Sequence, residues 1–199
     1  MVARRVPQPQ YMTVDEWREL EQRSHDVKHE YIDGYVYAMA GGTLDHSLVA
    51  VNAVALLNGA FGDGPCIAYN SDAAARLSPT CFTYPDATVT CDERDRGRIR
   101  EVKTPRLIVE VLSDTTEAYD RGDKFGYYRQ CPTVQEYVLM STRCQLIEVF
   151  RRTLKGWEYQ SYGPGDEVEL TSINLRFSVA VLYRRTTVPE TLEIREGEV

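Results

Sequence analysis

The sequence predicts one α/β (α+β) domain, a mixed central sheet flanked by helices. Helix-like and strand-like segments follow one another in the order helix, strands, helix, strands, which is typical of a sheet covered by helices. The chain has 199 residues, enough for one core that buries roughly 70% of the unfolded surface. Its apolar content of 43% is that of a globular protein, and no apolar run approaches the roughly 20 residues of a membrane span.

The two ends of the chain are predicted to lie outside this domain. Residues 1–11 are interpreted as a flexible arm, residues 12–185 as the domain and residues 186–199 as an acidic tail. Two arginines in the arm are followed by prolines and glutamines, in place of the apolar core of a signal peptide. We therefore expect a cytoplasmic protein.

The first two elements carry strong local signals. Thr13 and Glu16 have the spacing of a capping box, which predicts a helix running to about Ser24. Two β-rich runs then flank Asp33-Gly34, a strong hairpin signal. We expect a strand pair over residues 30–39.

A second helix and two short strands are predicted next. Apolar residues recur at helical spacing over residues 45–58, and Gly59 is expected to end that helix. Short β-rich runs predict strands at 66–69 and 73–77.

The most regular part of the sequence follows. A strand over 84–91 and a strongly apolar strand over 107–112 are joined by a charged loop over 92–104, so the two strands can pair as a long hairpin. A third helix is expected over 119–130. Further strands are predicted at 136–140, 145–151, 157–162 and 168–170.

The cysteines indicate no disulfide framework. They are odd in number and scattered, and none forms a C-x-x-C pair, which argues against both disulfides and a zinc knuckle. We expect all five to be reduced and mostly buried: Cys66, Cys81, Cys91, Cys131 and Cys144.

Two carboxylates in apolar strands are the strongest chemical signal. Glu110 stands in the middle of Ile-Val-Glu-Val-Leu, and Asp86 directly precedes the β-rich run 87–90. A buried unpaired charge costs several kcal/mol unless a cation or a proton compensates it. If the two strands pair, both carboxylates can reach one face of the sheet, where Mg²⁺ or Mn²⁺ would relieve their repulsion. Such a site suits phosphoryl chemistry, because a metal polarises the phosphate and activates water.

The helix expected after these strands offers a cation. Asp120 and Lys124 are four residues apart and would share one helix face. Lys124 is a candidate for orienting the attacking water. It could equally form an ordinary exposed ion pair, and the local pattern leaves both interpretations open.

The order of these residues resembles a known group of enzymes. Tyr84-Pro85-Asp86, followed at a distance by Val109-Glu110-Val111, is similar to the PD-(D/E)XK nuclease superfamily, which has a restriction-endonuclease-like core. Over residues 12–183 the chain more closely resembles a bacterial family described as "putative restriction endonuclease", of uncertain role. The residues that carry this likeness are Glu30–Gly34, Met39–Gly42, His46, Tyr84–Asp86, Pro105, Glu110–Ser113, Thr116, Asp120, Lys124 and Tyr128.

The resemblance implies a set of site residues. Asp86, Glu110 and the backbone carbonyl of Val111 would hold the metal. The usual lysine of the E-x-K motif is here Leu112, which shares a strand face with Glu110 and cannot orient water. The lysine would then have moved to Lys124.

Four further residues are candidates for a role in the site. Glu30 would be an additional acidic residue that supports the metal or a water, although a polar residue at a hairpin edge is the plainer interpretation. His46 could contact phosphate, or simply form hydrogen bonds at a helix start. Arg96 and Arg98 belong to a run of arginines at every second position, which in extended form could follow a phosphate backbone. Interspersed acidic residues favour a solvated hairpin tip instead.

These observations predict a metal-dependent nuclease that hydrolyses phosphodiester bonds of nucleic acid, with DNA as the expected substrate, Mg²⁺ or Mn²⁺ as cofactor and no membrane partner. A homodimer is expected by analogy, because related folds cut two strands by pairing subunits. The alternative is a catalytically inactive nucleic-acid-binding or regulatory module on a nuclease scaffold. The net charge of −7 and Leu112 at the lysine position favour that alternative.

Overall fold

The central sheet of the protein has six strands. The computed structural model describes residues 10–24, 26–39, 41–98 and 100–192. In spatial order the strands of this sheet are β12 (Gly156–Tyr162), β11 (Ile147–Thr153), β10 (Glu136–Met140), β9 (Leu107–Val111), β7 (Ala87–Thr90) and β4 (Ile67–Asn70).

This sheet is mixed, as the sequence predicts. Strands β9 and β10 run parallel, and the other neighbours are antiparallel. Every residue of β9 and β10 is buried, because both faces of the sheet are covered. The predicted pairing of the two strands that carry the carboxylates is confirmed as β7–β9.

A second six-stranded sheet packs beside the first. The predicted hairpin forms here, and both Asp33 and Gly34 have positive φ, at 49° and 94°. The strands in spatial order are β1 (Gln10–Tyr11), β3 (Tyr35–Ala38), β2 (His29–Ile32), β6 (Cys81–Thr83), β5 (Ala74–Ser78) and β8 (Glu101–Val102). A separate two-stranded sheet is made by β13 (Glu167–Leu170) and β14 (Leu175–Ser178).

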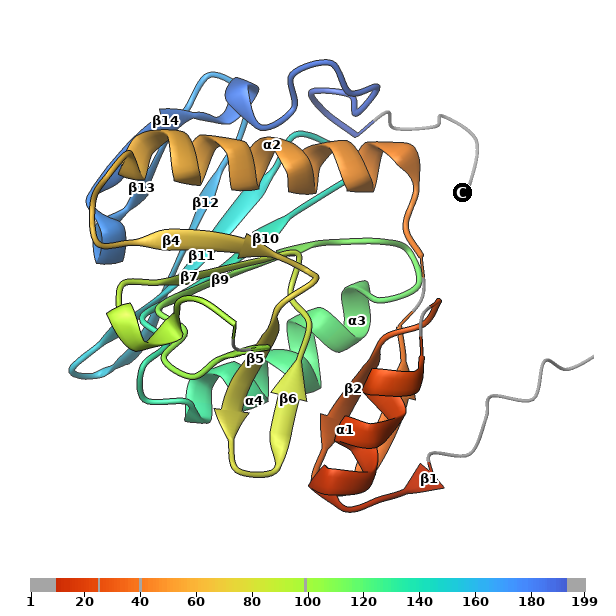
Figure 1. Cartoon of the computed structure of the whole chain (residues 1–199). Helices are drawn as coiled ribbons and strands as arrows, with labels where there is room; N and C mark the ends of the chain where they lie inside the picture. Colours follow the sequence, from red (N-terminus) through yellow and green to blue (C-terminus); the bar gives the residue numbers. More distant parts are fainter. Residues whose placement is uncertain (1–9, 25, 40, 99, 193–199) are drawn as a thin grey trace, which may run out of the picture.

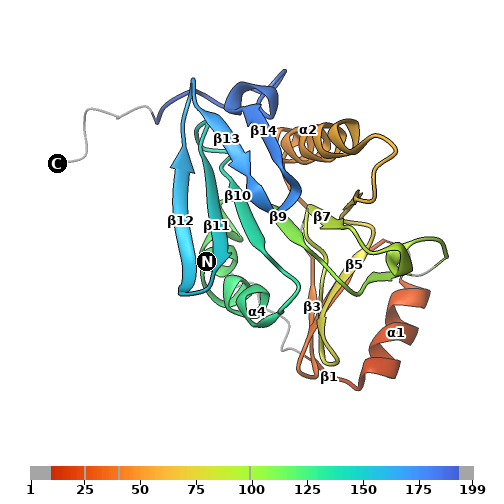
Figure 2. The ribbon, with the colours of Figure 1, turned by 90° about the vertical axis from the view of Figure 1, so that its left-hand side faces the viewer.

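Helices cover both sheets. Helix α1 (Val14–Arg23) begins with the predicted capping box and packs Trp17 on the second sheet. Helix α2 (Leu44–Phe61) and the β13–β14 pair cover one face of the central sheet, and α4 (Phe125–Gln130) covers the other (Figures 1 and 2). The remaining helical segments are α3 (Glu117–Tyr119), the π-helix η2 (Asp120–Lys124), and the 3-10 helices η1 (Glu93–Asp95), η3 (Thr171–Ile173) and η4 (Val179–Val181).

Helix α2 is longer than the sequence predicts. It continues through Gly59 and ends at the cap residue Gly62, because Phe61, beyond Gly59, still packs against the core that covers the central sheet. With 18 residues and a hydropathy of 1.3, α2 matches a membrane span by length and composition alone. In the structure, one face of α2 forms part of the core through Val49, Ala53 and Leu57.

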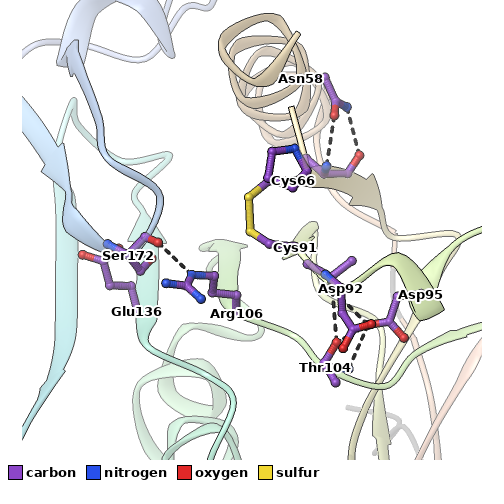
Figure 3. The surroundings of a disulfide bond; sticks show 12 residues. Asn58, Cys66, Cys91, Asp92, Asp95, Thr104, Arg106, Glu136 and Ser172 are labelled. Carbon is purple, nitrogen blue, oxygen red and sulfur yellow. Dashed lines mark hydrogen bonds between the residues drawn. A yellow bond between two sulfur atoms is a disulfide. The ribbon is translucent and has the colours of Figure 1, made fainter. Parts of the chain in front are cut away.

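One cysteine pair corrects the prediction that all five cysteines are reduced. Cys66 and Cys91 form a disulfide, with 3.9 Å between their Cα atoms (Figure 3). They flank the paired ends of β4 and β7, where Ile67 lies opposite Thr90. The sequence could not reveal this pair, because the register of two strands brings together cysteines 25 positions apart. The free cysteines are Cys81, Cys131 and Cys144.

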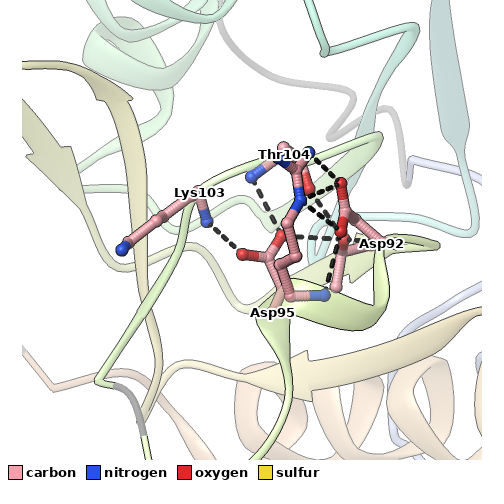
Figure 4. A network of polar contacts seen from close by, with 6 residues as sticks. Asp92, Asp95, Lys103 and Thr104 are labelled. Carbon is pink, nitrogen blue, oxygen red and sulfur yellow. Dashed lines mark hydrogen bonds and ion pairs between the residues drawn. The ribbon is translucent and has the colours of Figure 1, made fainter.

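The charged loop after β7 is held by one buried carboxylate. Asp95 accepts hydrogen bonds from the backbone amides of Lys103 and Thr104, at 2.9 Å each, and from the hydroxyls of Thr90 and Thr104 (Figure 4). These hydrogen bonds join the start of the loop, at Asp95, to its end, at Lys103 and Thr104. Its first turn is the 3-10 helix η1, so the predicted run of arginines does not form one extended strand.

Candidate active site

The two carboxylates predicted to bind metal come together at the ends of β7 and β9. Ala87 lies opposite Val109, and one step further this register places Asp86 beside Glu110. Partners across an antiparallel pair point to the same face of the sheet. The Oδ2 atom of Asp86 also accepts a hydrogen bond of 2.8 Å from the backbone amide of Val111, which ties the carboxylate to the neighbouring strand.

Lys124 lies at the centre of the acidic cluster. Its Nζ atom is 2.8 Å from Oε1 of Glu110, 3.1 Å from Oε1 of Glu30 and 3.6 Å from Oδ1 of Asp120. All four side chains are buried. The structure thus brings Lys124 to the place that the resemblance implies, next to Glu110, and excludes the alternative of an exposed ion pair.

The helix that carries Lys124 is locally widened. Residues Asp120–Lys124 form a π-helix between α3 and α4, where the sequence predicts one regular helix. A single π turn inserted in an α-helix is often found at functional sites. Here it places both Asp120 and Lys124 on the buried side, while Arg121 and Asp123 remain exposed.

Glu30 and His46 complete the ring of polar groups. Glu30 comes from the second sheet, and its Oε1 accepts a hydrogen bond of 3.3 Å from the backbone amide of Tyr84. His46 lies in the first turn of α2, capped by Thr43, with its Nε2 3.5 Å from Oδ2 of Asp86. Elements far apart in the chain therefore converge on one site.

Two residues that the sequence did not single out as site residues also contact the cluster. The hydroxyl of Tyr128 donates a hydrogen bond of 2.6 Å to Oε1 of Glu110, and Tyr128 is fully buried. Asp120 is the third carboxylate around Lys124. A spacing of four residues on either side of Lys124 is the signal that could have identified both of them.

The polar groups open into a cavity of about 420 Å³. Glu30, His46, Asp86, Glu110 and Lys124 line it, and Val111 lines it beside them. Serine, threonine and tyrosine side chains make up much of the remaining wall: Ser113, Thr115, Thr116, Tyr37, Tyr84, Tyr119 and Tyr127. A cavity of this size is typical of a small-ligand site.

Burial dominates the electrostatics of the site. It raises the pKa of Glu110 to about 8, although Lys124 acts in the opposite direction. Burial also raises the pKa of Asp86, against His46, the Val111 amide and Lys124, and raises the pKa of Asp120. Burial lowers the pKa of Lys124, but the surrounding carboxylates outweigh it, so that its pKa lies well above the usual value. The ammonium group stays charged.

The site carries more acid than its lysine can balance. Ionisation of Glu30, Asp86, Glu110 and Asp120 against one ammonium group leaves three negative charges uncompensated. Within the described parts of the chain, no group of three His, Cys, Asp or Glu side chains is arranged to hold a metal ion. Asp86 and Glu110 are the pair that could do so, since Mg²⁺ commonly takes only one or two carboxylates and keeps water for its other positions.

The two predicted arginine contacts lie away from this cavity. Arg96 binds the backbone carbonyl of Pro65 at 2.8 Å, and neither Arg96 nor Arg98 lines the cavity. Both side chains are exposed on the loop that Asp95 holds. The structure therefore does not bring Arg96 and Arg98 together with the carboxylates.

Comparison with known proteins identifies the family. The pattern of the Uma2 family, described as "Putative restriction endonuclease", matches residues 14–181. The chain belongs to this family. The Uma2 match includes every strand of the central sheet, every strand of the second sheet except β1, and every residue that lines the cavity.

Two similar proteins support this membership. The "Uncharacterized protein slr1290" of Synechocystis sp. is 41% identical over 175 residues, which cover 87% of this chain and 92% of that protein. The "Uncharacterized protein sll1609" of the same organism is 30% identical over 145 residues, or 71% and 81% of the two chains.

A solved structure shares the fold. The crystal structure of "a putative nuclease belonging to DUF820" from Anabaena variabilis has a TM-score of 0.72 at 19% sequence identity, and the match covers 86% of this chain and 97% of that one. The restriction-endonuclease-like core implied by the resemblance is consistent with this likeness. Membership of the Uma2 family supports a nuclease-like function.

Proposed function

We propose that this Uma2 protein is an endonuclease that depends on a divalent metal and hydrolyses phosphodiester bonds of DNA. The observation that carries the proposal is the pair of half-buried Asp86 and buried Glu110 at paired strand ends, with Lys124 at 2.8 Å from Glu110. A buried carboxylate needs a cation, a proton or several hydrogen-bond donors to offset its lost hydration. Here four buried or nearly buried carboxylates face one lysine.

Mg²⁺ or Mn²⁺ would be held by Asp86 and Glu110, with the backbone carbonyl of Val111 as a further ligand. When bound, the metal supplies Lewis-acid polarisation of the phosphate and an activated water. The ammonium group of Lys124 would orient the attacking water and offset negative charge that develops on the phosphate. Glu30 holds Lys124 in position, and His46, which lines the cavity, would donate a hydrogen bond to a phosphate oxygen.

A cleavage assay tests this proposal. Single- and double-stranded DNA and RNA are incubated with Mg²⁺ or Mn²⁺, and we expect cleavage that EDTA abolishes. Asp86→Asn and Glu110→Gln should each lower the rate by about 100-fold or more, because each removes a charged ligand. Asp114→Asn is the matched control, since Asp114 is exposed and lies outside the cavity.

The second candidate is a catalytically inactive module that binds nucleic acid. The acidic net charge of −7 is the observation that favours it. Leu112 carries less weight for it, because the ammonium group of Lys124 lies 2.8 Å from Glu110 and could supply the missing cation. Inactivity of the wild type on all four substrates with both metals, together with measurable binding, would support this candidate and exclude the endonuclease.

We also propose that the protein acts as a homodimer in the cytoplasm. Two copies related by a two-fold axis would present two equivalent cavities to nucleic acid. Sedimentation equilibrium tests the dimer, with a single species of monomer mass as the contrary result. The Cys66–Cys91 disulfide is the observation against that location, since disulfides are rare in a reducing compartment.

A further inference from the structure

Three exposed tyrosines lie on one face of the second sheet. Tyr11 of β1 lies opposite Tyr35 of β3, and Tyr37 follows two residues later on the same strand. Cross-strand partners and alternate residues share a face of a sheet. The exposed fractions are 73%, 44% and 45%, respectively. We call Tyr11, Tyr35 and Tyr37 the tyrosine stripe.

The outer rings of the stripe are held in place although they are exposed. The rings of Tyr11 and Tyr35 contact each other edge to face, with 5.9 Å between their centroids. The ring of Tyr11 also lies over Gly34, where a Cβ atom would come within 2.5 Å of it. Glycine is therefore required at position 34 for two reasons: the turn needs a φ of +94°, and a side chain would collide with the ring of Tyr11. Large exposed rings that are fixed in this way form a preorganised aromatic surface.

The stripe is continuous with the candidate active site. Tyr37 lies opposite Glu30 in the β2–β3 pair and lines the cavity together with Tyr119 and Tyr127. One end of the stripe is thus at the wall of the cavity that holds the carboxylates. A ligand lying along the three rings would lead into that cavity.

The charges around the cavity decide which ligand fits. Among the described residues that line it, only His46 and Lys124 can carry positive charge. Duplex DNA is held mainly by many basic contacts to its phosphates. An unpaired strand also offers the flat faces of its bases, which stack on aromatic side chains whatever their sequence. Aromatic rings with few cations match the unpaired strand better than the duplex.

We propose that the tyrosine stripe binds the bases of single-stranded DNA and guides that strand into the cavity. The proposal rests on the proposed nuclease function and narrows its substrate to an unpaired strand. Each ring offers one stacking surface, and Tyr37 places the last of these bases next to Glu30 and the reacting phosphate. Sequence preference is not expected, because stacking does not read the edges of bases.

Fluorescence anisotropy with the full chain tests the proposal. The probes are a labelled oligothymidylate of 12 nucleotides and the duplex that it forms with oligodeoxyadenylate, in a buffer that contains Ca²⁺ in place of Mg²⁺. We expect the single strand to bind more tightly. Tyr11→Ala and Tyr35→Ala should each weaken binding by about 5- to 150-fold. Tyr11→Phe and Tyr35→Phe should stay near the wild type, because they keep the ring.

Tyr159→Ala is the matched control. Tyr159 is a tyrosine of similar exposure, 55%, in strand β12 of the other sheet, and its substitution should leave binding unchanged. Thermal melting verifies that the variants are folded. Equal binding by the alanine variants and the wild type would overturn the proposal, and so would duplex binding as tight as that of the single strand. A dimer that dissociates in the Tyr11→Ala and Tyr35→Ala variants would assign the stripe to a second copy instead and would also overturn it.

Cleavage separates this inference from the proposed function. If the wild type cuts duplex DNA as fast as single strands and the stripe variants cut normally, the stripe has no role while the nuclease remains. If the wild type cleaves no substrate, and the stripe variants still bind single strands more weakly than the wild type, the nuclease proposal is wrong while the binding role of the stripe is supported.

Discussion

The ammonium group of Lys124 and the carboxylate of Glu110 form a buried ion pair of 2.8 Å between a π-helix and the central sheet. Only 7% and 5% of the two side chains are exposed. The pair joins the two layers of the protein at the site. Water therefore screens the interaction weakly, and removal of either side chain should lower the stability of the fold.

Removal of this lysine should strongly destabilise the fold. Above about pH 8, where Glu110 is ionised, Lys124→Met leaves Glu30, Glu110 and Asp120 buried without their shared cation, which typically costs about 3–5 kcal/mol. Urea denaturation measures the loss. Lys155→Met, at an exposed lysine, is the control and should change the free energy of unfolding by less than about 0.5 kcal/mol. A Lys124 variant as stable as this control would show that the ion pair contributes little.

The stability of the metal-free protein should fall as pH rises. Burial raises the pKa of Glu110 from 4.5 to about 8 in the folded state, so between these values the folded chain holds a proton that the unfolded chain has released. Stability then declines with pH, by up to about 1.4 kcal/mol per pH unit for one proton. Glu110→Gln should reduce this slope. It should not abolish it, because the pKa values of Asp86 and Asp120 are raised in the same direction.

Urea midpoints in EDTA, measured from about pH 4.5 to about pH 8, give this slope. A wild type that becomes more stable across the range, or a Glu110→Gln variant with an unchanged slope, would contradict the assignment of the proton to Glu110.

A divalent cation should stabilise the wild type through Asp86. Mn²⁺ at 100 times its dissociation constant would add about 2.7 kcal/mol to the free energy of unfolding if it binds only the folded chain. Asp86→Asn should abolish this gain while leaving the metal-free protein at least as stable, since it removes one charge from an excess of negative charge. Asp72→Asn, at an exposed carboxylate that pairs with Lys28, is the control.

Calorimetric titration and thermal melts measure this effect. Retention of the full Mn²⁺ response in Asp86→Asn would remove Asp86 from the metal site, whatever the cleavage assay shows.

The disulfide determines how many cysteine thiols are free to react. The protein unfolded without reductant should react with a thiol reagent at three cysteines, and after reduction at five. The Cys66→Ala/Cys91→Ala double variant should lose about 3 kcal/mol, because the bond closes a loop across 25 positions. Cys144→Ala, at a free cysteine, is the matched control. Five reactive thiols before reduction would instead show that all five cysteines are reduced, as the sequence predicts.

Local patterns in the sequence were sufficient for much of the fold. The capping box at Thr13 and the Asp33-Gly34 turn depend on neighbouring residues, and both form as predicted. The apolar run around Glu110 likewise forms a strand buried on both faces. Such features can be predicted because they depend on hydrogen bonds over a few residues and on the pattern of apolar side chains at neighbouring positions.

Tertiary structure decided what depends on distant contacts. The register of β4 and β7 joined Cys66 to Cys91, and packing on the central sheet carried α2 past Gly59. The π turn buries Asp120 and Lys124 together and places Lys124 against Glu110 and Glu30, which come from distant segments. The sequence alone determined which residues are the charged candidates for the site. The tertiary structure determined which of those charges share one cavity, because strand register and the packing of helices on sheets are set by contacts between segments far apart in the chain.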